Sequence, residues 1–103
     1  MMAKVKVANV NDIGEGELKK VEVGSEPVVL FKVDGKIYAT QNKCSHVGCG
    51  LDENHAIQGE IVECTCHGSQ FNIKTGAVIL PPAVESLKTY QVSVKGEEVF
   101  IEE

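Results

Sequence analysis

The chain of 103 residues contains no arginine, and all ten of its basic residues are lysines. Arginine supplies the planar donor pairs that bind phosphates and guanine edges. Because the formal net charge is also -5, we predict that the protein does not bind nucleic acid. The acidic charge favours docking to a basic patch on a partner protein, in an association that salt weakens. Charge that serves only solubility is the alternative.

Long hydrophobic runs are absent as well. The longest, residues 28–31 and 77–80, fall far short of the roughly 20 apolar residues that span a bilayer. The first seven residues alternate polar and apolar side chains and lack the apolar core and cleavage site of a secretory signal. We therefore expect a cytoplasmic protein without a membrane span. The length allows one modest hydrophobic core, so we expect a single domain over residues 1–103, present as a monomer.

Strands dominate the predicted secondary structure. Segments rich in Val, Ile and aromatic residues recur at close spacing and are bounded by glycine-containing turns such as Asp34-Gly35 and Lys95-Gly96. No stretch keeps a 3.6-residue apolar period over three turns, and helix is indicated only around 11–13 and 52–56. The sequence predicts an antiparallel all-β domain with strands at residues 5–8, 18–23, 28–33, 36–40, 61–64, 70–73, 90–94 and 99–101.

The segment from residue 41 to 68 holds all four cysteines and all three histidines. Cys44 and His46 form a Cys-x-His pair, and Cys64 and His67 form a Cys-x-x-His pair after a spacer of seventeen residues. Two such loops at the ends of adjacent hairpins can bind one metal centre from two sides. Leu80 to Ala83 contains two prolines, which lack backbone donors, so this segment is predicted to be a stiff loop.

These ligand pairs resemble those of Rieske proteins. The resemblance extends to Gly68-Ser69, to Thr75-Gly76, to the prolines at 81 and 82, and to a closing hairpin at 90–100. It implies the Rieske fold, in which stacked antiparallel sheets carry an inserted cluster-binding subdomain, here approximately residues 42–83. It also implies one [2Fe-2S] cluster, bound by Cys44, His46, Cys64 and His67.

The resemblance also suggests how the four ligands divide their work. Two ferric ions, two sulfides and two thiolates sum to zero charge when the histidines are neutral, so adding an electron costs less than in a cluster with four thiolates. Cys44 and Cys64 are expected to hold the iron that stays ferric, and His46 and His67 the iron that accepts the electron. The uncoordinated imidazole nitrogens can titrate, so we expect the potential to fall at alkaline pH.

By its length, the chain looks like the Rieske ferredoxins that serve ring-hydroxylating oxygenases. The resemblance therefore implies a soluble one-electron carrier, not an enzyme, between a flavin-dependent reductase and a terminal oxygenase. A small Rieske subunit bound within a larger oxidoreductase, such as a nitrite reductase or an arsenite oxidase, is the alternative. A structural zinc module built on the same two cysteines and two histidines is a third reading, from a different functional class.

Several neighbours of the ligands are candidates for tuning the cluster. Gly48, Gly50 and Gly68 let backbone N–H groups approach the cluster sulfurs, although all three also suit turns. Ser69 resembles the serine that donates to a bridging sulfide in the high-potential Rieske proteins of quinol-oxidising complexes. Phe71 stands where that group has a tyrosine, so we expect an intermediate potential.

The remaining cysteines give a mixed signal. Cys49 and Cys66 match the pair that forms a disulfide in the quinol-oxidising group, yet a reducing cytoplasm disfavours disulfides, and two unlinked thiols remain the alternative. By the same resemblance, Pro82 lies over the cluster, and Val47 and the histidine edges form the docking face. His55 is predicted to be a solvated loop residue. It is the one histidine beyond the ligands, so the chain cannot also build the two-histidine, one-carboxylate iron site of an oxygenase.

Overall fold

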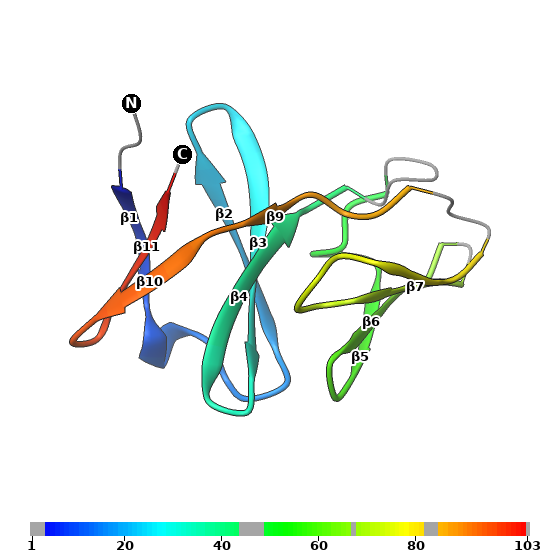
Figure 1. Cartoon of the computed structure of the whole chain (residues 1–103), viewed down its shortest axis with the longest axis horizontal. Helices are drawn as coiled ribbons and strands as arrows, with labels where there is room; N and C mark the ends of the chain where they lie inside the picture. The colour runs from blue at the N-terminus through cyan, green and yellow to red at the C-terminus, as the bar shows by residue number, and fades with distance from the viewer. Residues whose placement is uncertain (1–3, 44–48, 67, 82–84, 103) are drawn as a thin grey trace.

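The computed structural model of the chain describes residues 4–43, 49–66, 68–81 and 85–102. In this part of the chain, strands form three antiparallel sheets (Figure 1). The first sheet has the order β1 (Lys4–Asn9), β11 (Glu98–Glu102) and β10 (Val92–Lys95). The second has the order β2 (Leu18–Val23), β3 (Glu26–Val33), β4 (Lys36–Gln41) and β9 (Thr89–Tyr90). The third has the order β5 (His55–Gln58), β6 (Ile61–Cys64), β7 (Ser69–Asn72) and β8 (Val78–Leu80).

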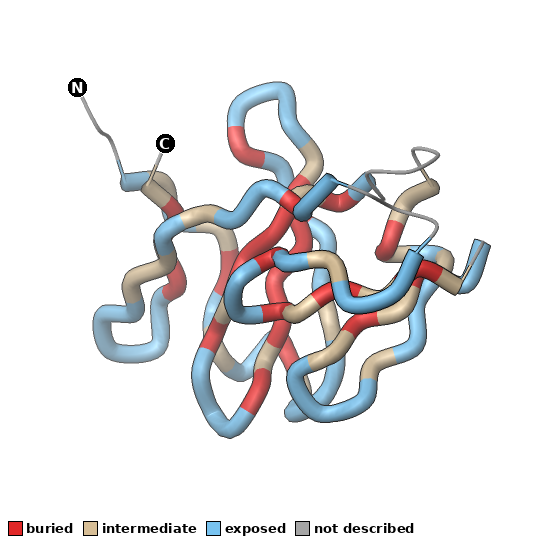
Figure 2. The backbone as a smooth tube through the Cα atoms, turned by 45° about the vertical axis from the view of Figure 1, so that its right-hand side comes forward, coloured by how far each residue is buried: buried red, intermediate tan, exposed pale blue. Residues whose placement is uncertain are grey.

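Strand β3 is buried on both of its faces, because it lies between two hydrophobic cores. Val28 and Leu30 pack in one core with residues of β1, β2 and β11, whereas Val29 and Phe31 pack in the other with residues of the third sheet. All four side chains are fully buried, and Figure 2 shows buried residues concentrated along the central strands. This double burial explains why β3 reads as a nearly continuous apolar run instead of an alternating one.

The all-β, antiparallel class predicted from the sequence is confirmed. The two-residue turn at Asp34–Gly35 joins β3 to β4 with both φ angles positive, 52° and 76°, as the right-handed twist of a hairpin requires. One short 3-10 helix, Val10–Asp12, lies close to the predicted helical segment at 11–13. No helix among the described residues is long and apolar enough to cross a membrane.

The helix indicated at residues 52–56 is wrong, because the chain turns there and then enters β5. Strand β5 is mostly exposed, and its sequence, His-Ala-Ile-Gln, has no strong β-formers except Ile57. It forms by pairing with β6 across a tight turn, with Ile57 opposite Val62. Strand β8 was also not predicted. It is a short edge strand that ends directly before the prolines.

The third sheet is inserted between β4 and β9 of the second, as Figure 1 shows. The chain leaves the second sheet after Gln41 and returns at Lys88. Gln41 joins the two passages, because its backbone N–H donates to the Lys88 carbonyl and its side-chain oxygen accepts the Lys88 N–H, both at 2.8 Å. The Gln41 side-chain nitrogen also donates to the Lys43 carbonyl at 2.7 Å. One side chain thus fixes both the entry to and the exit from the inserted sheet.

Candidate metal centre

Cys64 is the last residue of β6 and is fully buried. The strand alternates partly exposed and buried positions, so Val62 and Cys64 face the core while Ile61 and Glu63 do not. Cys64 packs in the same hydrophobic cluster as Phe71. A sulfur in this position is shielded from water at the end of the strand.

The turn after Cys64 is held by its own backbone. Gly68 has a φ of 81° and donates its N–H to the Cys64 carbonyl at 2.8 Å. A side chain at that φ is strained, so the turn requires glycine. Ser69 follows as the first residue of β7, lies directly opposite Cys64 in the strand register and is fully buried. The Gly68 amide therefore has a backbone acceptor within the turn, and a contact from it to a cluster sulfur remains a prediction.

The other motif loop is closed at its base by an amide–carboxylate pair of which the amide is buried and the carboxylate half-buried. Asn42, which is 4% exposed, donates from its side-chain nitrogen to Asp52 Oδ1 at 2.8 Å and accepts the Asp52 N–H at 2.9 Å. The Asn42 carbonyl accepts the Leu51 N–H at 2.7 Å. Lys43 and Gly50 form an isolated antiparallel bridge just above this pair. These bonds fix the two ends of the segment that carries Cys44 and His46.

Gly50 has a packing reason of its own. A Cβ at this position would lie 2.6 Å from Asp52 Oδ1 and 3.2 Å from Asn42 Nδ2. The Gly50 carbonyl accepts two hydrogen bonds from Asn54, one from its backbone N–H and one from its side-chain nitrogen, both at 3.1 Å. The absence of a side chain thus lets Gly50 fit against the Asn42–Asp52 pair, and a contact from its amide to the cluster remains a prediction.

A disulfide between Cys49 and Cys66 joins the two motif loops, with their Cα atoms 6.7 Å apart. Cys49 follows the segment 44–48 and Cys66 precedes His67, so the bond brings the two halves of the ligand pattern together. The Sγ atoms of Cys49, Cys64 and Cys66 all lie within 4.8 Å of one another. Sequence reasoning paired Cys49 with Cys66 through the family resemblance, and the structure contains that pair.

Of the four predicted ligands, Cys64 is described by the structure. Cys44, His46 and His67 lie outside the described residues, as do Gly48, Val47 and Pro82. The donor set suits a two-iron cluster because two thiolates and two imidazoles, from two loops that a disulfide joins, can serve two irons with two ligands each. Cys64 ends β6, next to the turn that the disulfide joins to the loop of Cys44 and His46, and this position fits the arrangement.

His55 differs from the prediction in its local structure. It opens β5 instead of lying in a loop, and it stands opposite Cys64 in the strand register. Its side chain is exposed, and the ring Nδ1 lies 2.7 Å from the Leu51 carbonyl oxygen. The ring thus supports the chain between the Asn42–Asp52 pair and β6.

A polar cluster that the sequence did not indicate joins side chains next to and on β9 to the start of β3, although β4 lies between these strands in the sheet. The Tyr90 hydroxyl donates to Glu26 Oε2 at 2.8 Å, and Lys88 Nζ lies 3.6 Å from the same oxygen and 4.9 Å from the Tyr90 ring centroid. Burial and, second, the bond to Glu26 raise the pKa of Tyr90 to about 12. The Tyr90 bond and, second, the Lys88 charge lower the pKa of Glu26.

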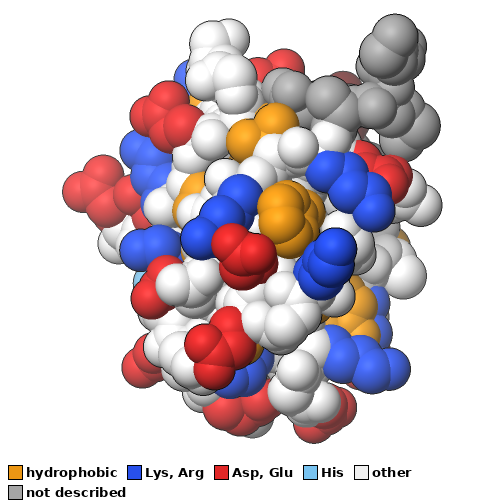
Figure 3. All heavy atoms as spheres, turned by 90° about the vertical axis from the view of Figure 1, so that its left-hand side faces the viewer, with side chains coloured by type: hydrophobic (Ala, Val, Ile, Leu, Met, Phe, Trp, Pro, Cys, Tyr) orange, Lys and Arg blue, Asp and Glu red, His pale blue; other side chains and the backbone are white. Residues whose placement is uncertain are grey.

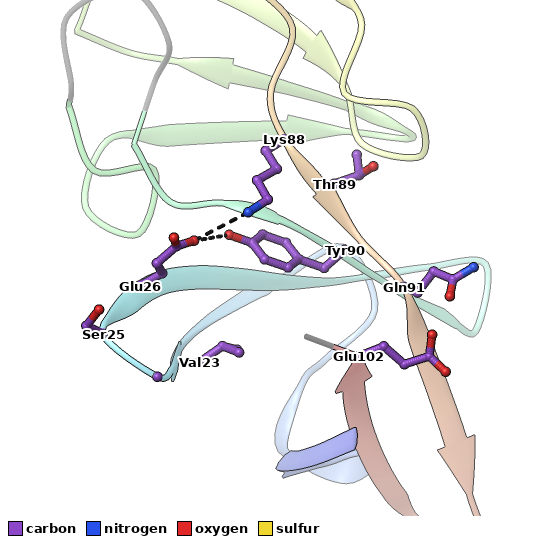
Figure 4. A pocket seen from close by; sticks show the side chains of 9 residues that line it. Val23, Ser25, Glu26, Lys88, Thr89, Tyr90, Gln91 and Glu102 are labelled. Carbon is purple, nitrogen blue, oxygen red and sulfur yellow. Dashed lines mark hydrogen bonds and ion pairs between the residues drawn. The ribbon is translucent and has the colours of Figure 1, made fainter. Parts of the chain in front are cut away.

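This polar cluster forms one wall of an open cavity of about 510 Å³ (Figure 4). Ser25, Gln91 and Glu102 line its other sides, as Figure 4 shows. The cavity lies between the two sheets that carry no predicted ligand. It is therefore separate from the metal centre, and the pair of Glu26 and Tyr90 links β3 to the chain that returns from the inserted sheet.

The surface on the side opposite the inserted sheet carries lysines and acidic residues intermixed around a few hydrophobic side chains (Figure 3). Lys6 and Glu98, for example, form an ion pair of 2.9 Å across β1 and β11. The charge on this face is therefore mixed, and it forms no uniform acidic patch for a basic partner.

Comparison with known proteins identifies the family. The Rieske [2Fe-2S] domain matches residues 3–91. The ferredoxin subunit of biphenyl dioxygenase from Pseudomonas sp. strain KKS102 is 35% identical over 101 residues, which cover 98% of this chain and 93% of the relative. The ferredoxin component of biphenyl 2,3-dioxygenase from Rhodococcus jostii strain RHA1 is also 35% identical, covering 98% and 94%.

Solved structures agree with these sequence matches. The ferredoxin of Sphingomonas yanoikuyae B1 superimposes with a TM-score of 0.90 at 30% identity, covering 98% of this chain and 99% of the ferredoxin. A chain from the complex of reduced oxygenase and oxidised ferredoxin of carbazole 1,9a-dioxygenase superimposes with a TM-score of 0.88 at 32% identity, covering 95% and 91%. The chain therefore belongs to the Rieske [2Fe-2S] domain family and carries one Rieske-type cluster.

Proposed function

We propose that this protein is a one-electron carrier that receives electrons from a flavin-dependent reductase and passes them to the terminal oxygenase of a ring-hydroxylating system. The observation that carries the proposal is the match to dioxygenase ferredoxin subunits over 98% of this chain and more than nine-tenths of their length. A ferredoxin of this fold forms a complex with the oxygenase of carbazole 1,9a-dioxygenase. The corresponding partner proposed for the present chain is the terminal oxygenase of its own system.

The proposed ligands are Cys44 and Cys64 on one iron and His46 and His67 on the other. When bound, the cluster supplies a one-electron redox couple. The chain's part is to hold the thiolate of Cys64 in a buried position and to anchor the loop of Cys44 and His46 through the Asn42–Asp52 pair. The disulfide between Cys49 and Cys66 joins the two ligand loops. We further propose that it persists in the working protein, although the expected location is cytoplasmic.

Ser69 is proposed to raise the potential. Its side chain is fully buried, and it stands opposite Cys64 in the strand register. A hydroxyl donor near the cluster sulfurs stabilises the additional negative charge of the reduced state. Phe71, two residues further along β7, is fully buried in the core and brings no hydroxyl. The combination predicts a reduction potential between that of the Rieske proteins of quinol-oxidising complexes and that of the oxygenase ferredoxins.

The experiment that tests this function is a visible spectrum of the purified protein, recorded as isolated, after ascorbate and after dithionite. A red-brown protein that either reductant bleaches supports the carrier, and the reductant required ranks its potential. Steady reduction of the cluster by NADH and the reductase of a biphenyl dioxygenase system would support the proposed donor. A colourless protein that holds stoichiometric zinc after expression with abundant iron and sulfide would overturn the proposal in favour of a structural zinc module.

The alternative of a subunit bound within a larger oxidoreductase is separated by the state of the purified protein. A carrier is stable alone and exchanges between partners in a transient, salt-dependent association. Size-exclusion chromatography of the untagged protein from its native host distinguishes the two, because a permanent subunit elutes with its larger partner at all salt concentrations.

A further inference from the structure

Three cysteine sulfurs meet at the end of β6. The Sγ atoms of Cys49, Cys64 and Cys66 lie within 4.8 Å of one another, and two of them form the disulfide. Thiol–disulfide exchange requires a thiolate that reaches one sulfur of an existing disulfide. We propose that the chain without its cluster has a second covalent form, in which Cys64 is bonded to Cys49 and Cys66 carries the thiol. The inference rests on Cys64 as a proposed ligand and goes beyond the carrier function.

Burial selects Cys49 as the sulfur that Cys64 attacks. Cys49 is half-buried and packs against the hydrophobic cluster that contains Cys64, whereas Cys66 is exposed in the turn after β6. Attack on Cys49 releases Cys66 into water, where its negative charge is solvated. Attack on Cys66 would instead release Cys49 against the core and would close a ring across the single residue Thr65. Exchange therefore favours the pair of Cys49 and Cys64.

The exchange balances within the chain. Cys64 loses its proton, and its sulfur forms a bond to the Sγ of Cys49. The bond between Cys49 and Cys66 breaks, and Cys66 takes the electron pair of that bond and then a proton. One disulfide and one thiol of this group are present before and after, so the step needs neither an oxidant nor a reductant.

The two forms differ in their capacity for the cluster. While Cys64 binds iron, its sulfur is not available for attack, so the bound cluster keeps the disulfide on Cys49 and Cys66. In the exchanged form Cys64 is consumed, and one of the four proposed ligands is lost. A low-molecular-weight thiol can reopen the bond and restore the ligand. The exchange is also reversible within the chain, because Cys66 can attack Cys49 and release Cys64 again, so the exchanged form slows reloading of the cluster and a thiol speeds it.

Peptide mapping tests the exchange directly. The cluster is stripped from the full-length protein with acid and a chelator, without oxygen or thiol, and the protein is returned to neutral pH. Samples are quenched, alkylated with N-ethylmaleimide and cleaved after glutamate, which at Glu63 separates Cys49 from the peptide of Cys64 and Cys66. We expect the alkyl label to move from Cys64 to Cys66 with time, while the cluster-loaded protein keeps its Cys49–Cys66 bond.

Two variants make the test specific. Cys64→Ser removes the attacking sulfur and should leave the Cys49–Cys66 bond in place in the stripped protein. Cys44→Ser keeps that sulfur and should still show the shift of label to Cys66. The proposal would be overturned if the label stayed on Cys64 in the stripped protein. It would also be overturned if label appeared on Cys66 in the stripped Cys64→Ser variant.

A second comparison separates folded geometry from random exchange. The same stripped protein in guanidinium chloride samples all pairings of its four cysteines. If the folded protein gave the same distribution of linked peptides as the unfolded chain, the placement of the three sulfurs would not direct the exchange, and the proposal would be wrong. The visible spectrum of the loaded protein reports the carrier function independently, so failure of one claim is distinguishable from failure of the other.

Discussion

At the scale of single residues, the Asn42–Asp52 pair has the clearest consequence for the metal centre. Asn42 is almost fully buried, and its side chain makes two bonds to Asp52 among the described residues. Asn42→Ala leaves the carboxylate and the amide of Asp52 without these partners, which costs about 1 to 3 kcal/mol in the free energy of unfolding. Because the pair closes the loop of Cys44 and His46, we also expect faster loss of the cluster, measured as decay of its visible absorption.

Asp52→Asn is the matched control, because its side-chain oxygen still accepts the bond from Asn42. It should keep a cluster lifetime close to that of the wild type. The double variant of Asn42→Ala with Asp52→Ala should lose little more stability than Asn42→Ala alone, since Asn42→Ala already removes the bond between the two side chains. Additive losses in this cycle would show that the two side chains act separately.

Ser69 belongs to the same scale and tests tuning instead of anchoring. Ser69→Ala removes a buried hydroxyl opposite Cys64, and we expect the midpoint potential to fall, as measured by a redox titration followed in the visible spectrum. Ser93→Ala is the control, because that buried hydroxyl on β10 has no hydrogen-bond partner among the described residues. An unchanged midpoint in Ser69→Ala would reduce Ser69 to a residue of the turn and strand.

At the scale of elements, Tyr90 and Glu26 link β9 to β3 and make stability depend on pH at both extremes, through the burial of Tyr90 and, second, the hydrogen bond between the two side chains. The pKa of Tyr90 rises from 10.0 to about 12 in the folded state. The folded protein therefore holds this proton more tightly than the unfolded chain, and the stabilisation is complete below pH 10 and lost as the pH rises toward 12. Glu26 has a lowered pKa, so its contribution is present above 4.5 and lost as the pH falls.

Tyr90→Phe removes the shared hydrogen bond, which is the largest cause of the Glu26 shift. We expect unfolding by guanidinium chloride, followed by circular dichroism, to depend less on pH in the variant, both between pH 10 and 12 and on the acid side. Tyr38→Phe, which removes a hydroxyl from β4 beneath Lys74, is the control. Equal pH profiles for the wild type and Tyr90→Phe would contradict the link.

The same scale shows what the sequence could predict. Strands β2, β3 and β4 alternate or bury apolar residues over six to eight positions, so their local pattern suffices. Strands β5 and β8 lie at the two edges of the inserted sheet, and β5 buries none of its residues fully. The conformation of β5 comes from pairing with β6, which no local pattern records, whereas Val78 and Ile79 of β8 favour a strand but the run is only three residues long.

In the candidate site, too, the sequence could indicate some residues and not others. Cysteine and histidine are chemically distinctive, so spacing could single out Cys64 as a candidate ligand, and a family pattern could predict the Cys49–Cys66 pair that the structure contains. Asn42, Asp52 and Gln41 could not, because asparagine, aspartate and glutamine next to a loop are ordinary surface residues in a sequence. Their roles depend on hydrogen bonds between residues that are far apart in the chain. The side chains of Asn42 and Asp52 are 10 residues apart, and the Gln41 side chain accepts the backbone N–H of Lys88, 47 residues away.

At the scale of the whole molecule, the exposed hydrophobic side chains are unevenly placed. Of the large ones in the described part of the chain, Ile79 and Leu80 are adjacent on β8, with 42% and 45% of their surface exposed. Leu80 pairs with Gln70, the neighbour of Ser69, so this apolar surface borders the metal centre. Val94, 48% exposed, lies on β10 in a different sheet (Figure 1). Adjacent exposed apolar side chains are typical of surfaces that a partner covers.

Leu80→Asp tests whether this surface contributes to electron exchange. Less than half of the Leu80 surface is left for a partner to cover, which contributes about 1 kcal/mol, so its loss should slow reduction of the cluster by the flavin-dependent reductase by roughly fivefold. Val94→Asp adds the same charge and removes a similar exposed side chain far from the ligands, and it should leave the rate unchanged. Because the contact is apolar, the difference between the two variants should persist at high salt, whereas a purely electrostatic docking would make both variants equal to the wild type once charges are screened.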